Sequence, residues 1–253
     1  MAKIIAVANQ KGGVGKTTTC VNLTYALKKR GRKVLLVDCD AQGNATSGMG
    51  VDKSITPNMD SILSQGVPAK ECIVSTKYGD VIPTNKDLSG ASVELVDMED
   101  REYILKNALE AIRDAYDYIL IDCPPSLELL TVNALAAADS VLVPVQCEYY
   151  ALEGIADLTT TIKMINANIN PNLEIQGIVL TMYDSRTNFS EQVAEEIKRY
   201  FGNKVYNTRI PRNIRLAEAP SHGKPVIAYD RISRGAAAYL KLGLELVKQV
   251  EGK

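Results

Sequence analysis

The sequence contains no run of apolar residues that approaches the ~18 needed to cross a bilayer as a helix. It also shows no cleavable secretory signal, because Lys3 is followed at once by a strand-length apolar run. Its cysteines are scattered, odd in number and without a C-x-x-C pair, which indicates reduced thiols rather than disulfides or an iron–sulfur site. We therefore expect a cytoplasmic protein with no membrane association.

Charge of one sign is not in excess either. The net charge of −1 does not by itself suggest a polyanionic partner, and the hydrophobic and charged contents are ordinary for a globular protein. The chain has no internal repeat, low-complexity tract or long linker. A length of 253 residues can bury a sizeable core, so residues 1–253 are expected to form one domain. The single histidine, His222, lies in a turn-rich segment without partners and is assigned no catalytic role.

Strand-like apolar runs alternate with helical periods along the chain. The predicted strands cover residues 3–8, 34–37, 118–121, 140–143 and 175–181. The predicted helices cover residues 18–30, 101–115, 152–166, 190–201 and 235–250, and the proline-containing stretch 47–88 predicts short helices. Strands buried on both faces, each followed by a helix, predict an α/β fold with a mostly parallel twisted sheet and helices on both faces. Ligands of such sheets bind beyond the carboxyl ends of the strands.

A phosphate-binding loop follows the first predicted strand, in the segment Lys11-Gly12-Gly13-Val14-Gly15-Lys16-Thr17-Thr18. It departs from the pattern G-x-x-x-x-G-K-[ST] because Gln10 occupies the first glycine position. The glycines still allow consecutive backbone N–H groups to surround phosphate oxygens. Lys16 can reach the β- and γ-phosphates, the Thr17 hydroxyl can bind Mg²⁺, and a helix starting near Thr17 directs its positive end at the same phosphates. The order strand, glycine loop, helix favours nucleotide binding over an incidental flexible turn.

Three aspartates follow apolar strands: Asp38 and Asp40 after the second, and Asp122 after the third. A carboxylate in this position of a phosphate-loop protein is placed to hold Mg²⁺, usually through water, and Asp122 is the first candidate. Asp38 and Asp40, two residues apart, share a face if extended and can line the γ-phosphate region, where one of them could orient the attacking water. Helix capping or turn formation explains any one of them, but the three together favour a hydrolytic site.

Lys11 is a second lysine in the loop with no obvious place in its own subunit, because Lys16 already neutralises the phosphates. Supplied across an interface, it would act as an arginine finger does on a transferring phosphoryl group. ATP would then lie at a two-fold interface and control the oligomeric state. The alternative is a solvated surface lysine.

Basic residues gather between residues 198 and 234. Nine of them stand against two acids, which gives 9 − 2 = +7, while the rest of the chain carries −1 − 7 = −8. Such segregation is typical of a surface that meets a polyanion. Without a recognition helix, zinc pattern or aromatic array beside it, phosphate contacts are favoured over base readout. A solvated face with its own salt bridges is the alternative.

These segments resemble the ParA/MinD superfamily of deviant Walker A ATPases, in particular the chromosomal ParA branch called Soj. Besides the loop, the resemblance rests on Asp122-Cys123-Pro124-Pro125-Ser126, on residues 144–154 and on Ile210-Pro211-Arg212-Asn213, and it extends from residue 3 to about residue 240. One departure is Ala41, where the family often has proline.

The resemblance implies an ATPase that uses ATP and Mg²⁺, forms a homodimer on ATP and binds double-stranded DNA without sequence preference. It also implies stimulation by a ParB-type centromere-binding protein, in partitioning of a chromosome or plasmid at the nucleoid. By the same resemblance Lys11 is the signature lysine and Asp40 serves the hydrolytic water. Further roles that it implies are phosphate and Mg²⁺ binding at Lys16 and Thr17, Mg²⁺-proximal carboxylates at Asp38 and Asp122, adenine contacts at Pro211 and Asn213, and DNA contacts at Arg186 and Arg215.

Other classes share parts of this pattern. A MinD-like membrane ATPase has the same loop, but the amphipathic tail 242–250 is short of cations and aromatic residues and is expected to pack on the core. An iron–sulfur carrier would need more than Cys123, and no acceptor site indicates a metabolic kinase or synthetase. Tyr149 and Tyr150 are interpreted as buried packing residues.

Overall fold

The computed structural model describes residues 1–126, 128–148 and 151–252, so the interpretation of Tyr149 and Tyr150 lies outside the described residues. Its centre is a seven-stranded sheet in the order β3-β4-β2-β5-β1-β6-β7. β3 pairs antiparallel with β4, and the other pairs are parallel, which confirms the predicted mostly parallel sheet. The strands are β1 (Lys3–Val7), β2 (Val34–Asp38), β3 (Val74–Thr76), β4 (Gly79–Ile82), β5 (Tyr118–Asp122), β6 (Ser140–Gln146) and β7 (Glu174–Thr181).

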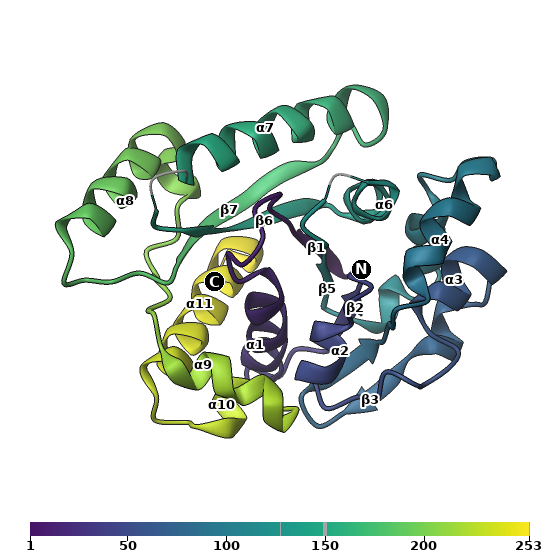
Figure 1. Ribbon diagram of the computed structural model, residues 1–253, viewed down its shortest axis with the longest axis horizontal. Helices are drawn as coiled ribbons and strands as arrows, with labels where there is room; N and C mark the ends of the chain where they lie inside the picture. The colour runs from purple at the N-terminus through teal and green to yellow at the C-terminus, as the bar shows by residue number, and fades with distance from the viewer. Residues whose placement is uncertain (127, 149–150, 253) are drawn as a thin grey trace.

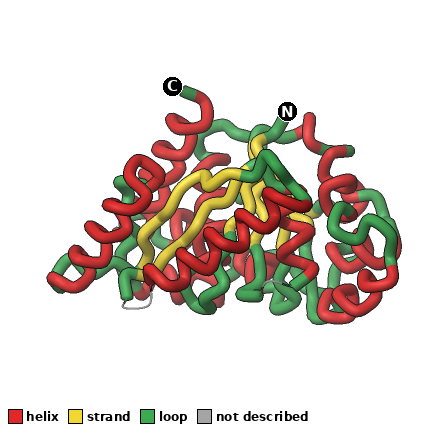
Figure 2. Tube along the Cα trace, turned by 90° about the horizontal axis from the view of Figure 1, so that it is seen from above, coloured by secondary structure: helices red, strands yellow, loops and turns green. Residues whose placement is uncertain are grey.

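Helices cover both faces of this sheet (Figures 1 and 2). The chain forms α1 (Lys16–Lys28), α2 (Asn44–Gly48), α3 (Met59–Gln65), α4 (Leu88–Glu94), α5 (Ile104–Glu110), α6 (Leu129–Ala137), α7 (Ala151–Asn168), α8 (Asn188–Phe201), α9 (Ile214–Glu218), α10 (Val226–Tyr229) and α11 (Arg234–Glu251). Alternate residues of β1 enter two separate cores, Ile4 with the face covered by α3 to α8, and Ile5 with the face covered by α1, α2, α10 and α11. The sheet is therefore buried on both faces, as its apolar strands predict.

Two sequence-based expectations differ from the structure. The predicted helix 101–115 is shortened to α5, because Asn133 of α6 binds the Arg101 carbonyl and the Leu105 N–H at its start, and the chain tightens into a 3₁₀ turn, Arg113–Ala115, after its end. The stretch 47–88 contains the short strands β3 and β4 as well as helices. Strands of three and four residues carry too little periodicity to be recognised beside three prolines.

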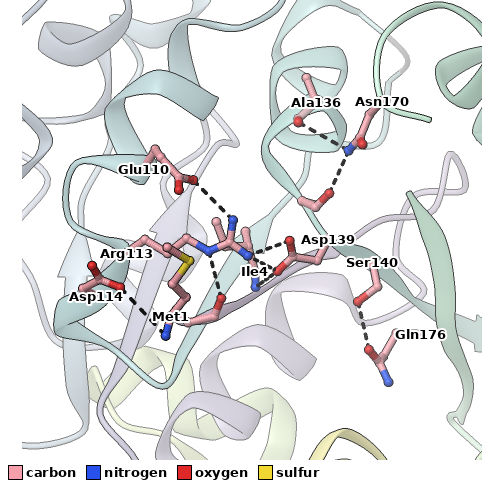
Figure 3. A network of polar contacts seen from close by, with 12 residues as sticks. Met1, Ile4, Glu110, Arg113, Asp114, Ala136, Asp139, Ser140, Asn170 and Gln176 are labelled. Atoms are coloured by element: carbon pink, nitrogen blue, oxygen red, sulfur yellow. Dashed lines mark hydrogen bonds and ion pairs between the residues drawn. The ribbon is translucent and has the colours of Figure 1, made fainter. Parts of the chain in front are cut away.

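The amino ends of the central strands are closed by a polar network (Figure 3). Asp139, just before β6, accepts the backbone N–H of Ile4 at 2.8 Å and both of its oxygens accept one Arg113 nitrogen at 2.7 Å. Asn170 donates to the carbonyls of Leu135 and Ala138 at the end of α6. The polar groups at this edge thus satisfy one another's hydrogen bonds. A ligand site is expected at the opposite edge, where the strands end in Asp38, Asp122 and Thr181.

Candidate nucleotide-binding and hydrolysis site

The glycine loop joins β1 to α1 at the carboxyl edge of the sheet. Gly13 and Gly15 have φ values of 74° and 90°, a region that a side chain disfavours. Gly15 immediately precedes α1, and no side chain among the described residues caps that helix, so its first N–H groups are left for an anion. The Thr181 hydroxyl at the end of β7 donates to the Val14 carbonyl at 2.8 Å and ties the loop to the sheet.

Lys16 is the buried cation of the site, with 7% of its surface exposed. Its Nζ donates to the carbonyl oxygen of Lys11 at 3.1 Å, so the ammonium lies inside the curve of the loop. Burial lowers the pKa of Lys16, and the negative charge of Asp122 opposes that shift. A phosphate entering the loop would meet a cation already positioned.

Asp38 and Asp122 lie opposite each other on the neighbouring strands β2 and β5, and both are fully buried. Asp38 is well satisfied: it accepts from the N–H and the hydroxyl of Thr46, each at 2.7 Å, and from the Asp40 N–H at 3.2 Å. Burial nevertheless raises the pKa of Asp38 to about 6, with the Thr46 hydrogen bonds acting against the shift. Burial, and next the charge of Asp38, also raise the pKa of Asp122, and the nearby Thr17 hydroxyl opposes that shift.

Neither carboxylate oxygen of Asp122 has a hydrogen-bond partner of good geometry among the described residues. A buried carboxylate without partners is costly unless a ligand meets it. Oxygen atoms are the donors that Mg²⁺ prefers, and Thr17, at the start of α1, supplies a hydroxyl in the same loop. The donor set therefore fits a hydrated Mg²⁺. Across the described part of the chain no group of three or more His, Cys, Asp or Glu could hold a metal, so such an ion would depend on phosphate oxygens for further ligands.

Asp40 lies in the turn beyond β2 rather than in the strand. Its Oδ1 accepts the Gln42 N–H at 3.0 Å and its carbonyl accepts the Gly43 N–H at 2.7 Å, a turn that leads into α2. Ala41 is partly buried against the core at this point. Asp40 is half-buried, its N–H donates to Asp38, and its charge helps to raise the pKa values of Asp38 and Asp122.

Lys11 is held by its own protomer. Its N–H donates to Asn9 Oδ1 at 3.0 Å, and its Nζ lies 3.5 Å from Glu148 Oε2, just beyond β6. Sequence reasoning did not assign roles to Asn9 and Glu148. The pair Lys11–Glu148 joins residues 137 positions apart (148 − 11), so it could not be predicted from a local sequence pattern.

A cavity of about 430 Å³ opens beside the loop, within the size range of small-molecule sites. Pro211 and Asn213 line it together with Thr18, Thr181, Met182, Leu216 and Tyr239, and their contact with a base stays a prediction. Asn213 also caps α9, because its Oδ1 accepts the Arg215 N–H at 3.1 Å. The structure thus brings the glycine loop and the 210–213 segment together across more than 190 residues of sequence (210 − 15 = 195).

Several basic residues of the window 198–234 are paired with acids, which the composition of the window does not indicate. Arg209 pairs with Glu191, Lys204 with Glu174, and Arg199 with Glu196, all acids outside the window. Arg215 pairs with Glu218 at 2.7 Å and Asp230 at 3.2 Å, and Arg186, which is 86% exposed, pairs with Asp184 at 2.7 Å. Five of the nine cations in the window make no ion pair with any residue that the structure describes: Lys198, Arg212, Lys224, Arg231 and Arg234. His222 stacks on Tyr229, with ring centroids 4.8 Å apart.

Comparison with known proteins adds to this geometry. A family model described as an AAA domain matches residues 2–175. The chain is 56% identical over 249 residues to the sporulation initiation inhibitor protein Soj of Bacillus subtilis, covering 97% of this chain and 98% of that protein. It is 52% identical over 252 residues to the chromosome partitioning protein ParA of Myxococcus xanthus, covering 98% and 89%. A crystal structure of cobyrinic acid a,c-diamide synthase from Mycobacterium smegmatis, with bound ADP and magnesium, is similar with a TM-score of 0.87 at 38% identity, covering 100% of this chain and 97% of that chain.

A lysine ahead of the glycine loop distinguishes the deviant Walker A proteins, and Lys11 occupies that position here. With the sheet and the strand-end aspartates around it, the protein is a P-loop ATPase of the deviant Walker A type. Within that class the similarity to Soj and ParA covers almost the whole chain at more than half identity. The chain belongs to the ParA/Soj family of chromosome-partitioning ATPases.

Proposed function

We propose that residues 1–253 act as one ATPase domain whose MgATP-bound form is a homodimer. The dimer binds double-stranded DNA without sequence preference at the nucleoid, and a ParB-type partner stimulates hydrolysis and so releases it. The single observation that carries the nucleotide chemistry is the buried carboxylate of Asp122, with no hydrogen-bond partner of good geometry among the described residues, near the buried ammonium of Lys16. The partitioning role is supported by the similarity to Soj and ParA.

Each loop residue has a task in this proposal. Backbone N–H groups of Gly12, Gly13, Val14 and Gly15 surround the phosphates, and Lys16 exchanges the Lys11 carbonyl for a β- or γ-phosphate oxygen. Thr17 with Asp38 and Asp122 would hold Mg²⁺, directly or through water. A Mg²⁺ ion held there would neutralise negative charge on the phosphates. Thr18, Pro211 and Asn213 line the space for the base.

Hydrolysis needs a positioned water and a cation at the transferring phosphoryl group. Asp40, half-buried in a hydrogen-bonded turn next to Asp38 and Asp122, orients the water. Lys11 supplies the cation to the neighbouring protomer's nucleotide, because Lys16 already serves its own. Two protomers thereby complete two sites across a two-fold axis.

DNA contact is proposed for Arg186 and Arg215, both exposed and both paired with acids in the single protomer. Exposed pairs of this kind are weak, so a phosphate can replace the acid at small cost. Two copies of the surface on one dimer raise the effective concentration of the second contact. ATP-dependent pairing would therefore switch DNA binding on.

The test is retention of DNA with ATP, with ADP and without nucleotide, for the wild type and for Arg186→Ala and Arg215→Ala. We expect retention with ATP alone, and each substitution should reduce the slope of log affinity against log salt by about 0.9 per contact, or about 1.8 per dimer. Arg101→Ala is the matched control, since Arg101 also pairs with an acid, Glu102, but is not a proposed DNA contact. Equal retention in the three nucleotide conditions would contradict the switch.

Gly12→Val tests the proposed link between dimer formation and DNA contact, because a branched side chain in the loop would stand in the way of a second protomer. We expect dimers and ATP-dependent DNA retention to be lost together, by light scattering and by the retention assay. Retention without dimers would refute the proposed link between pairing and DNA binding.

A further inference from the structure

Residue 11 is held at three atoms by groups of its own protomer. Its N–H is bound by Asn9 Oδ1, its carbonyl accepts from Lys16 Nζ, and its own Nζ pairs with Glu148. Asn9 is buried and its amide donates to the Pro144 carbonyl of β6 at 2.8 Å, while Gln10 donates to Thr161 of α7 at 3.1 Å. The backbone that carries Lys11 is thus anchored to β6 and α7. Glu148, just beyond the end of β6, provides the acid that pairs with its side chain.

Glu148 is positioned for that contact by the chain around it. Its N–H donates to the Gln146 carbonyl at 2.8 Å, and its carboxylate accepts from the Gln146 amide. The Lys11 and Glu148 side chains are 34% and 48% exposed, so water and a second protomer can reach the pair. An ion pair at this degree of exposure contributes only a small stabilising free energy.

We propose that Glu148 is a positioning residue that retains the Lys11 ammonium on its own protomer until the neighbouring nucleotide competes for it. This inference rests on the proposed function, in which Lys11 serves the phosphates of a second protomer. A single ammonium group cannot stay beside Glu148 and also reach across an interface, so assembly breaks the pair. Because a two-fold dimer has two such lysines, each assembly event breaks two pairs.

The size of the effect follows from the weakness of the contact. An exposed ion pair favours the paired state by about twofold to fivefold. Breaking two of them changes the dimer dissociation constant by the square of that factor, about fourfold to twenty-fivefold. Salt screens the pair, so the difference made by Glu148 shrinks as the ionic strength rises.

The pair itself is tested in the nucleotide-free protein by labelling with an amine-reactive acetylating reagent, read by mass spectrometry at Lys11 and Lys204. We expect Glu148→Gln to raise the labelling rate of Lys11 by about twofold to fivefold and to leave Lys204 unchanged. Glu174→Gln is the reciprocal control, because Glu174 pairs with Lys204 at 3.4 Å and should release only that lysine. An unchanged rate at Lys11 overturns the proposal, whatever the function of the protein.

The consequence for assembly is tested by sedimentation with Mg²⁺ and a non-hydrolysable ATP analogue. Glu148→Gln should lower the dimer dissociation constant by about fourfold to twenty-fivefold at low salt and by less at high salt, while Glu174→Gln leaves it unchanged. Glu148→Asp, which keeps the charge, should behave more like the wild type. A higher dissociation constant for Glu148→Gln, or a difference independent of salt, overturns the proposed role. A wild type that stays monomeric with the analogue refutes the proposed dimer, whereas the labelling result still decides the Lys11–Glu148 pair.

Discussion

Asp122 illustrates how the site is built at the scale of one residue. Its carboxylate is fully buried at the end of β5, neither oxygen has a hydrogen-bond partner of good geometry among the described residues, and the buried Asp38 lies on the next strand. Desolvating a carboxylate without a partner costs free energy, and a second carboxylate adds to that cost. The nucleotide-free protein is therefore destabilised locally at the position that we propose to serve Mg²⁺.

Asp122→Asn should consequently act in opposite directions on stability and activity. We expect the nucleotide-free protein to gain about 1–2 kcal/mol in free energy of unfolding, because a buried amide is cheaper to desolvate than a buried carboxylate. Hydrolysis of ATP should fall on the order of a hundredfold. Urea unfolding without nucleotide and phosphate release with MgATP measure the two effects. Asp114→Asn, at an exposed acid, is the control, and a loss of stability in Asp122→Asn would show that a partner satisfies the carboxylate.

At the scale of elements, the loop that carries Asp40 is packed against the segment that carries the basic residues. α2 follows that loop and packs against the 3₁₀ turn Ala219–His222. Just beyond these two elements, the backbones of Gly50 and Gly223 lie against each other. The side-chain oxygen of Asn22 in α1 accepts the N–H of Val226 at the start of α10 at 2.7 Å. The Asp40 loop and α1 are therefore in direct contact with the segment that carries the basic residues.

Substituting Gly223 tests how tight that contact is. A Cβ at Gly223 would lie 2.9 Å from the Gly50 Cα, and its φ is +58°. Gly66 has a similar φ of +68°, but a Cβ there would meet nothing within 4 Å, so Gly66→Ala reports backbone strain alone. We expect Gly66→Ala to cost about 1–2 kcal/mol and Gly223→Ala to cost about 1–3 kcal/mol more, measured by urea unfolding. Equal losses would mean that the two backbones can move apart freely.

At the scale of the whole molecule, the packing of the C-terminal helix bears on the alternative of a MinD-like membrane ATPase. α11 packs along α1 and buries Tyr239, Leu242 and Leu246, so the apolar side of the tail is part of the core, as the sequence predicts (Figure 1). In the described ranges no helix is long and apolar enough to span a membrane. The buried side chains Tyr239, Leu242 and Leu246 are therefore not available to a lipid surface while α11 is packed on the core.

We accordingly expect no sedimentation of the protein with anionic phospholipid vesicles, with or without ATP. Pulling α11 away from the core would expose Leu242 and Leu246, and full burial of each such side chain contributes about 1.5–3 kcal/mol to folding. The measurement is co-sedimentation with vesicles, with DNA-coated beads as the positive control. ATP-dependent vesicle binding that disappears on removal of residues 242–253 would favour the MinD-like alternative.

Local patterns were sufficient for the parts of the site that are contiguous in sequence. The glycine loop and the three aspartates could be predicted because a buried strand, a turn and a helix lie within a few residues of one another. The strands β3 and β4 could not, since they are short and gain their stability from pairing, β4 with β2 and β3 with β4. The basic window was overestimated, because Glu191 and Glu174, which pair with Arg209 and Lys204, lie outside it.

The sequence by itself determined the class of this protein: an α/β sheet with a phosphate loop, a leading lysine and acids at the strand ends. Tertiary structure alone decided what surrounds those groups. It left Asp122 without a hydrogen-bond partner of good geometry among the described residues, formed an open cavity between the loop and Pro211, and placed Glu148 beside Lys11. The physical reason is that a loop's conformation depends on neighbours in the chain, whereas burial and ion pairing depend on residues that only folding brings together.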